Sequence, residues 1–389
     1  MKYLFISDGR LFLNEGQENM EITSKFAEEK TEEAQRERSV HGWKSDRRQD
    51  VDPYYGSNII WGGQAGRRPF RKFRFKNVMA KNEDSIFYLL TNDIVAGLFE
   101  YNISENEELR IFHKNEFHEN GMDYSHGLGK FVAAMLNEDQ SVNLELLDNQ
   151  AKYEKSLTSG DSRDSNPCFS KFNNDEILYQ SAGIGRDDQG FVWAHGPEAI
   201  NKINITSCEI TTLLADDTYD FLTPKDDQQG NIYCIRRPYH RLGYSSPIKM
   251  VWYFITFPVR FIVAILRFLD AFTRLFNREP MTPAGPSLQS RTENKYVSVL
   301  GRTIDLAKVE RKARFLNEPS LVPNSWELIK LDNQGNISLI SKRVSSFDID
   351  DSGKLHITNG FRVKKIIQNK MQTVLKHNII ESIKVVKSM

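Results

Sequence analysis

Residues that could bind a metal or catalyse acid–base chemistry are scattered along the chain. None of the eight histidines stands in an HExxH motif or in a His-x-His pair beside a carboxylate, which are spacings typical of zinc sites. A Gly-x-Ser-x-Gly elbow is also absent, so a Ser-His-Asp arrangement stays open but cannot be located. The histidines are His41, His113, His118, His126, His195, His240, His356 and His377. The sequence identifies no catalytic or metal-ligating residue and predicts no cofactor, with a divalent cation such as calcium as the alternative.

Carboxylates are numerous, but the conspicuous ones stand just before a glycine. These are Asp187, Asp188, Asp226, Asp227, Asp332, Asp350 and Asp351. Asp accepts hydrogen bonds from the local backbone and Gly supplies a positive φ, so the pattern is typical of tight turns. We interpret these carboxylates as turn formers and not as acid–base catalysts.

The net charge argues against a nucleic-acid partner. Lys plus Arg and Asp plus Glu each number 52, so no global field attracts a polyanion. Residues 67–76 alternate cations with aromatic side chains. Such a segment could stack single-stranded bases, but the same pattern is typical of a half-buried strand with a basic outer face. The neutral balance favours the strand, and no nucleic acid is expected to bind.

Cysteine content and the N-terminus bear on location. Three cysteines, at positions 168, 208 and 234, are too few for a disulfide framework, and we expect all three to be buried. The first eight residues lack the apolar region of a signal peptide. These features predict a cytoplasmic protein.

Segment 250–276 has the most unusual composition in the chain. Arg260, Arg267 and Arg274 recur every seven residues, which places them along one stripe of a helix, while large apolar side chains cover most of the remaining circumference. Ser246 and Pro247 are suited to begin the helix, and Pro258 should kink it. The residues expected to contact a membrane are Trp252, Phe254, Phe257, Arg260, Phe261, Arg267, Phe268, Phe272 and Arg274.

Three arrangements of this segment stay open. A membrane-spanning helix is disfavoured because each of the three arginines and Asp270 would cost about 2.5 to 3.5 kcal/mol in mid-bilayer. A helix lying in the plane of an anionic membrane tolerates them, because guanidinium groups can meet headgroups. A helix that packs on a face of the protein, or into an oligomer, is the third arrangement. We favour the in-plane helix, and the oligomeric state is left open.

The elements that position these residues repeat. Asp-Asn-Gln-Gly-Asn-Ile-Ser at 332–338 recurs in varied form at 187–193, 227–235, 350–357 and 7–13, each copy a turn followed by a strand. Antiparallel meanders repeating every 40 to 50 residues or so predict propeller blades. We expect an all-β β-propeller, with six blades and seven as the alternative, a long helical insertion in a late blade and a charged helix near the N-terminus.

The expected organisation is one propeller over residues 1–389. Residues 379–386 have no following partner strand, so we expect them to pair with the N-terminal strand at 2–7 and close the ring. Three segments depart from the strand pattern: a charged helical insertion at 18–41, an amphipathic membrane-facing insertion at 245–281, and a flexible Pro/Ser-rich linker at 278–294.

The Asp-x-x-Gly-Asn-Ile-Tyr and Asp-x-x-Gly-Asn-Ile-Ser copies at 227–233 and 332–338 resemble the blade motif of NHL-type and gluconolactonase-type propellers. The helical excursion between positions 235 and 326 resembles the strictosidine-synthase-like branch of six-bladed propellers. The likeness covers the strand pattern over about half of the chain. Hydrolases of those families hold a metal ion in the central channel with Glu, Asn and Asp, and no positions here match that set.

The function expected from the sequence is a non-enzymatic β-propeller scaffold or interaction module. It would bind a protein partner and attach peripherally to the inner, anionic face of a membrane. The alternative is a propeller-type lactonase or hydrolase with a divalent metal in the central channel. Converging Asp, Glu, Asn or His side chains in that channel would favour the enzyme, whereas an apolar lining would favour the scaffold.

Overall fold

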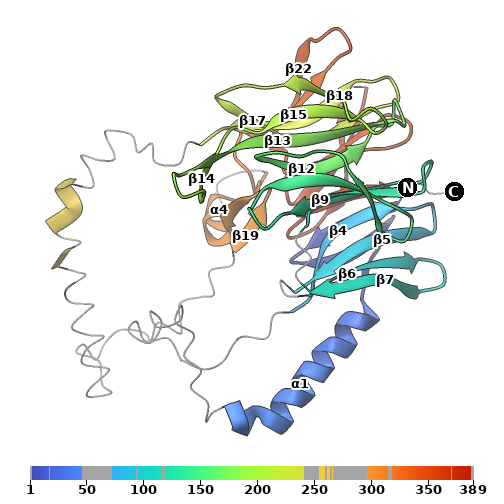
Figure 1. Cartoon of the computed structure of the whole chain (residues 1–389), viewed down its shortest axis with the longest axis vertical. Coiled ribbons are helices and arrows are strands. Elements are labelled where there is room, and N and C mark those ends of the chain that lie inside the picture. Colours follow the sequence, from blue (N-terminus) through green and yellow to red (C-terminus); the bar gives the residue numbers. More distant parts are fainter. Residues whose placement is uncertain are drawn as a thin grey trace. The chain divides into compact units, whose positions relative to one another are not determined.

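The computed structural model describes residues 2–16, 18–45, 72–92, 95–115, 119–240, 254–258, 261–262, 265, 296–313, 318–368 and 370–386 (Figure 1). The chain divides into two compact units. The first comprises residues 1–27, 72–240 and 295–389, and the second comprises residues 28–71 and 241–294.

The strands of the first unit pair into antiparallel meanders. The sheet that holds both ends of the chain has the order β27 (Ser382–Val386), β1 (Lys2–Ser7), β2 (Arg10–Glu15), β3 (Glu18–Ile22). The next has the order β4 (Arg74–Ala80), β5 (Ser85–Thr91), β6 (Val95–Asn102), β7 (Glu107–Asn115). The third consists of β8 (Glu119–Ser125), β9 (Lys130–Leu136), β10 (Val142–Leu147) and β11 (Tyr153–Ser156).

Three further meanders follow. The fourth consists of β12 (Ser162–Phe169), β13 (Glu176–Arg186), β15 (Ala199–Asn204) and β16 (Ile210–Leu214), with β14 (Val192–His195) paired to the far end of β13. The fifth consists of β17 (Tyr219–Asp226), β18 (Ile232–Pro238), β21 (Glu327–Leu331) and β22 (Ile337–Lys342). The sixth consists of β23 (Ser346–Ile349), β24 (Leu355–Thr358), β25 (Arg362–Ile367) and β26 (Lys370–Lys376).

Smaller elements complete the first unit. A parallel bridge between Val142 and Arg163 joins the third and fourth meanders into one sheet. The chain between β18 and β21 includes a hairpin of β19 (Tyr296–Val299) and β20 (Arg302–Asp305), followed by helix α4 (Leu306–Ala313).

The innermost strands of the meanders form a closed ring. Strands β27, β4, β8, β12, β17 and β23 each contact the next in that order, and β23 contacts β27. Meanders arranged in this way around a common axis make a β-propeller. The predicted all-β propeller fold is therefore confirmed. The described strands give six meanders, while the blade number stays a prediction.

The packing between neighbouring sheets explains why central strands are apolar on both faces. Ile86 and Tyr88 of β5 belong to a cluster that contains Leu4 of the closing sheet. The intervening Phe87 packs in the opposite direction, with its ring centroid 4.9 Å from that of Phe131 of the third meander. Side chains alternate across a strand, so a sheet buried between two others needs apolar residues at successive positions.

The two ends of the chain meet in one sheet. Strand β1 lies between β2 and β27, with Lys2 opposite Val386 and Ile6 opposite Ser382. Tyr3 and Phe5 share a buried cluster with Ile383. Strand β27 is thus the innermost strand of the sheet that also contains β1, β2 and β3.

The Asp–Gly segments are turns, as predicted, but Asp226 is not a turn former: it ends β17, and its carboxylate accepts hydrogen bonds from the Ser170 hydroxyl and the Lys171 N–H. Asp332 Oδ1 accepts hydrogen bonds from the backbone N–H groups of Gln334 and Asn336 at 2.9 and 2.8 Å, and Gly335 has a φ of 84°. Asp227 and Asp350 make the same pair of backbone contacts. The carboxylates are used to shape hairpins.

The charged helical insertion expected at 18–41 begins later than predicted. Residues Glu18–Ile22 form β3, the outer strand of the closing sheet, and helix α1 runs from Lys25 to Ser45 (Figure 1). Ile22 is buried against the sheet, and the Ser24 hydroxyl accepts the N–H of Ala27 at 3.3 Å. A buried Ile and a serine N-cap fix the boundary between strand and helix.

Candidate functional site: the central cavity

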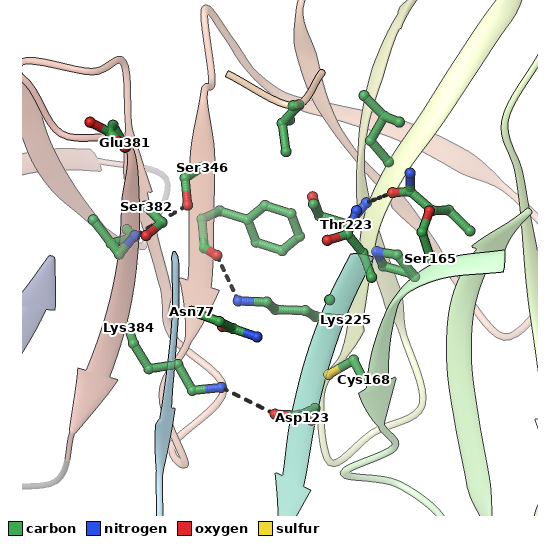
Figure 2. A pocket seen from close by; sticks show the side chains of 18 of the residues that line it. Asn77, Asp123, Ser165, Cys168, Thr223, Lys225, Ser346, Glu381, Ser382 and Lys384 are labelled. Carbon is green, nitrogen blue, oxygen red and sulfur yellow. Dashed lines mark hydrogen bonds and ion pairs between the residues drawn. The ribbon is translucent and has the colours of Figure 1, made fainter. Parts of the chain in front are cut away.

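A cavity of about 460 Å³ lies inside the ring, lined by all of its innermost strands. Figure 2 shows side chains from several strands pointing into it, among them Asn77, Asp123, Ser165, Thr223, Lys225 and Lys384. Most of these side chains are polar or charged. The lining therefore differs from the apolar one expected of a scaffold and includes the Asp, Glu and Asn side chains expected to favour an enzyme, although no three His, Cys, Asp or Glu side chains among the described residues lie close enough to hold a metal ion.

Two of the lining strands bulge at a residue–proline pair. In β12 the register shifts between Ser165 and Cys168, and Asn166, which precedes a proline, has a φ of 48°. In β17 the register shifts between Leu222 and Lys225, and Thr223, which also precedes a proline, has a φ of 50°. Positive φ is costly for a β-branched residue, so the surrounding structure must hold this conformation.

Two hydroxyl groups at the bulges have no hydrogen-bond partner among the described residues. The Thr223 N–H donates to Gln180 Oε1 at 2.9 Å, which fixes the backbone of the bulge. The Oγ atoms of Ser165 and Thr223 are buried and make no hydrogen bond within the described part of the chain. Both residues line the cavity (Figure 2).

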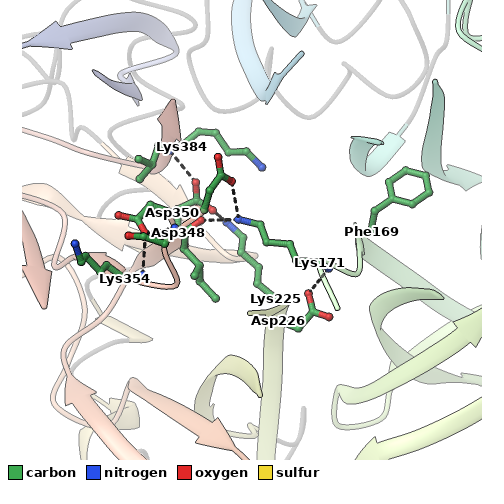
Figure 3. A network of polar contacts seen from close by, with 12 residues as sticks. Phe169, Lys171, Lys225, Asp226, Asp348, Asp350, Lys354 and Lys384 are labelled. Carbon is green, nitrogen blue, oxygen red and sulfur yellow. Dashed lines mark hydrogen bonds and ion pairs between the residues drawn. The ribbon is translucent and has the colours of Figure 1, made fainter. Parts of the chain in front are cut away.

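The end of the cavity at which the inner strands finish is occupied by ion pairs. Lys225 Nζ lies 2.8 Å from Asp348 Oδ1, and Lys384 Nζ lies 3.8 Å from Asp123 Oδ1. The N–H of Val385 donates to Asp348 Oδ2 at 2.7 Å. Figure 3 shows Asp348 among lysine side chains that come from β17 and β27. These contacts connect β17, β23, β27 and β8 across the ring.

The pKa values at this end keep the groups charged. Burial alone would raise the pKa of Asp348, but Lys225 and Lys384 outweigh it and hold that pKa far below its usual range. Burial would lower the pKa of Lys384, but Asp348 and Asp123 raise it above its usual range. Burial raises the pKa of the Cys168 thiol, so this cysteine is not an activated nucleophile.

The other end of the cavity has a different electrostatic character. Arg163 lines it, and its side chain makes no hydrogen bond or ion pair with any described residue. Glu198 also lines it, and its buried Oε2 atom has no partner among those residues. Burial, assisted by Asp220, raises the pKa of Glu198 to about 7, although Arg163 and Arg237 act in the opposite direction.

A hairpin turn lies over this end. Leu300 and Gly301, between β19 and β20, line the cavity and have φ values of 47° and 76°. Arg237 donates to the Leu300 carbonyl at 2.7 Å and pairs with Asp220 at 2.9 Å. The turn is thus held in place by an arginine that is itself paired.

The described histidines do not assemble a metal or catalytic site. His356 is fully buried between the Tyr3 hydroxyl and Asp350, with both contacts at 3.2 Å, so no substrate can reach it. Within the residues that the structure describes, no three His, Cys, Asp or Glu side chains lie close enough to hold a metal ion. Of the cysteines, Cys234 is buried as expected, whereas Cys168 and Cys208 are partly exposed.

The predicted membrane-contact residues fall in the second unit, where residues 254–258, 261–262 and 265 are helical. Phe254, Phe257 and Phe261 are 84, 62 and 55% exposed. Among the described residues, none of the helices combines the length and apolar character needed to cross a bilayer. The remaining predicted residues, Trp252, Arg260, Arg267, Phe268, Phe272 and Arg274, lie outside the described residues.

Comparison with known proteins concerns the fold alone. No protein-family model and no curated protein matches the chain. A TolB structure from Acinetobacter baumannii is similar at a TM-score of 0.49 and 7% identity, over 98% of this chain and 65% of that one. A chain of the nidogen/laminin complex is similar at a TM-score of 0.49 and 7% identity, over 98% of this chain and 97% of that one. The tricorn protease gives 0.46 and 10%, over 97% of this chain and 33% of the protease chain, so this chain spans about a third of it.

Proposed function

We propose that this protein is a non-enzymatic β-propeller interaction module that attaches peripherally to an anionic, cytoplasmic membrane surface through residues 245–281 and presents propeller loops to a protein partner. The observation that supports it best is the group of exposed apolar side chains in the helical part of that segment. They are 44 to 84% exposed and comprise Phe254, Ile255, Phe257, Phe261, Ile262 and Ile265. Contiguous exposed apolar side chains mark interaction surfaces.

A membrane surface fits the composition of this segment. Each exposed phenylalanine that enters the acyl boundary contributes roughly 1.5 to 3 kcal/mol. The arginines at 260, 267 and 274 recur in the sequence at seven-residue intervals, and each would contribute about 1 kcal/mol near anionic headgroups. Together these terms are sufficient for reversible peripheral attachment.

Only the ion-paired end of the cavity supports a non-enzymatic interpretation of the propeller. Its carboxylates Asp123 and the adjacent Asp348 are ion-paired with lysines, and the described donors form no group suited to a divalent cation. The observation that favours the alternative, a lactonase or hydrolase, is Glu198, because a carboxyl group with a pKa near 7 suits general acid–base catalysis. The motif at 227–233 supports grouping the propeller with the NHL-type and gluconolactonase-type branches.

Liposome flotation tests the proposal. We expect the full chain to float with vesicles of phosphatidylcholine and phosphatidylserine, and less with phosphatidylcholine alone. A variant in which a Gly/Ser linker replaces residues 247–277 should remain in the bottom fraction and keep the cooperative unfolding transition of the parent. If the replaced protein still floats, the segment is not the anchor. If it unfolds or aggregates, the segment belongs to the protein's own core or to a subunit interface.

A further inference from the structure

We propose that the Arg163 end of the central cavity is a binding site for a small organic carboxylate that also bears hydroxyl groups. The inference goes beyond membrane attachment, because it concerns the first unit alone. It rests on Arg163, whose side chain makes no ion pair with a described residue, and on three buried polar atoms that line the same cavity and have no hydrogen-bond partner among those residues.

Arg163 is a half-exposed cation that an external carboxylate can reach. It enters the cavity from β12 and has no carboxylate oxygen within ion-pair distance in the described part of the chain. The other charged groups that line or adjoin the cavity from β17, β18 and β27 have partners: Lys225 pairs with Asp348, Arg237 with Asp220, and Lys384 with Asp123. A planar guanidinium binds a carboxylate through two parallel hydrogen bonds, so a carboxylate is its natural ligand.

The unpartnered polar atoms call for a ligand with hydroxyl groups. Ser165 is 2% exposed, and its Oγ makes no hydrogen bond to any described residue. Thr223 Oγ1 and Glu198 Oε2 are also buried and make no hydrogen bond to any described residue. Buried polar groups nearly always have partners, and hydroxyl groups both donate and accept. A hydroxylated ligand satisfies Ser165, Thr223 and Glu198 together.

The surroundings hold these groups in place. Gln180 accepts the Thr223 N–H through Oε1, which leaves its amide N–H₂ to hydrogen-bond Glu198. The volume of about 460 Å³ is within the range of small-molecule sites. Since the opposite end of the cavity is filled by paired charges, a ligand's carboxylate is directed to Arg163.

Isothermal titration with the full chain tests the site, using glucuronate, citrate and glycerate as hydroxylated carboxylates and glucose as the uncharged counterpart of glucuronate. We expect at least one carboxylate to bind, and glucose to bind at least about tenfold more weakly than glucuronate. Arg163→Gln should weaken carboxylate binding at least about tenfold, with partial recovery in Arg163→Lys. The matched control Arg311→Gln, on the exposed side of α4, should bind like the parent.

The pH dependence gives a second readout. Glu198 faces Arg163, Asp220 and Arg237, and Arg163 also faces His195, whose pKa is lowered by burial. Above its pKa of about 7, Glu198 is ionised and repels a carboxylate, so binding should be tighter at pH 6.5 than at pH 8. Glu198→Gln should remove most of that difference.

Two results would overturn the proposal: no binding of any of the three carboxylates up to about 10 mM, or equal binding by the parent and Arg163→Gln. Neither result depends on vesicles, so failure of this site leaves the membrane proposal untouched. A urea unfolding curve for Arg163→Gln shows whether a loss of binding reflects a loss of folding.

Discussion

Replacing Asp348 by Asn tests how the inner strands of the propeller are held together. Asp348 lies 2.8 Å from Lys225 Nζ and is 5% exposed, whereas Lys225 is 21% exposed. At an effective dielectric constant near 20, such a pair attracts by about 6 kcal/mol, and the cost of removing both charges from water offsets a large part of this. Asn keeps the size and can still accept the N–H of Val385, so the variant removes the charge and little else.

We expect Asp348→Asn to lower the free energy of unfolding by about 3 kcal/mol at pH 7. Lys225 and Lys384 would then face each other without their shared counter-charge. Urea unfolding followed by circular dichroism measures the difference. The folded-state pKa of Asp348 is depressed below the ordinary 3.8, so its contribution is present above about pH 4 and is lost as the pH falls further. The difference in the free energy of unfolding between the parent and the variant should therefore become smaller in acid.

The matched control is Asp188→Asn, an exposed aspartate at the tip of the β13–β14 arm. It should change the free energy of unfolding by less than about 0.5 kcal/mol. If Asp348→Asn is as stable as this control at pH 7, the network does not hold the ring together and the reasoning fails.

Three further predictions concern the rest of the first unit. Removing residues 378–389 deletes β27 and the buried Ile380 and Ile383. Each isoleucine contributes about 1.5 to 3 kcal/mol, and the deletion also exposes the edge of β1, so we expect no cooperative urea transition. An unchanged midpoint would contradict the pairing of the chain ends. Burial lowers the pKa of His356, although Asp350 acts in the opposite direction. The free energy of unfolding of the parent should therefore fall as the pH drops below 6.5, and it should depend less on pH in His356→Gln. The same pH dependence in both proteins would argue against a neutral, buried histidine. Burial raises the thiol pKa of Cys168 and Cys234, so Ellman's reagent should modify Cys208 first in the native protein, and equal rates would refute this.

Much of the strand order could be predicted because the turns are chemically explicit. Asp–Gly pairs marked the hairpins, and alternation or apolar runs marked the strands between them. Strand β3 was not predicted, because four of its five residues are exposed and its sequence does not alternate between apolar and polar residues. The β19–β20 hairpin was not predicted, because two four-residue strands beside a linker are too short to show a recognisable pattern. The start of strand β12 at Ser162 is hard to predict, because the Asn-Pro bulge within the strand resembles a turn in the sequence.

The candidate site was not predictable in the same way. Arg163 and Glu198 stand on different parts of the fourth meander, and no spacing motif connects them. Their significance comes from what surrounds them: the Arg163 side chain has no ion-pair partner among the described residues, and burial raises the pKa of Glu198. The available sequence signal was an Asn-Pro and a Thr-Pro inside strand-like segments, which indicate bulges that can redirect side chains.

The most direct test of membrane attachment is to measure vesicle affinity and thermal stability on one variant in which Arg260, Arg267 and Arg274 are all replaced by Gln. If the arginines contact headgroups, binding to phosphatidylserine vesicles should weaken by about 1 kcal/mol per site, or roughly 150-fold in all. Added salt should weaken the parent's binding over the same range, and the melting temperature should stay unchanged. A variant that melts at a lower temperature but binds vesicles as tightly as the parent would contradict the proposal.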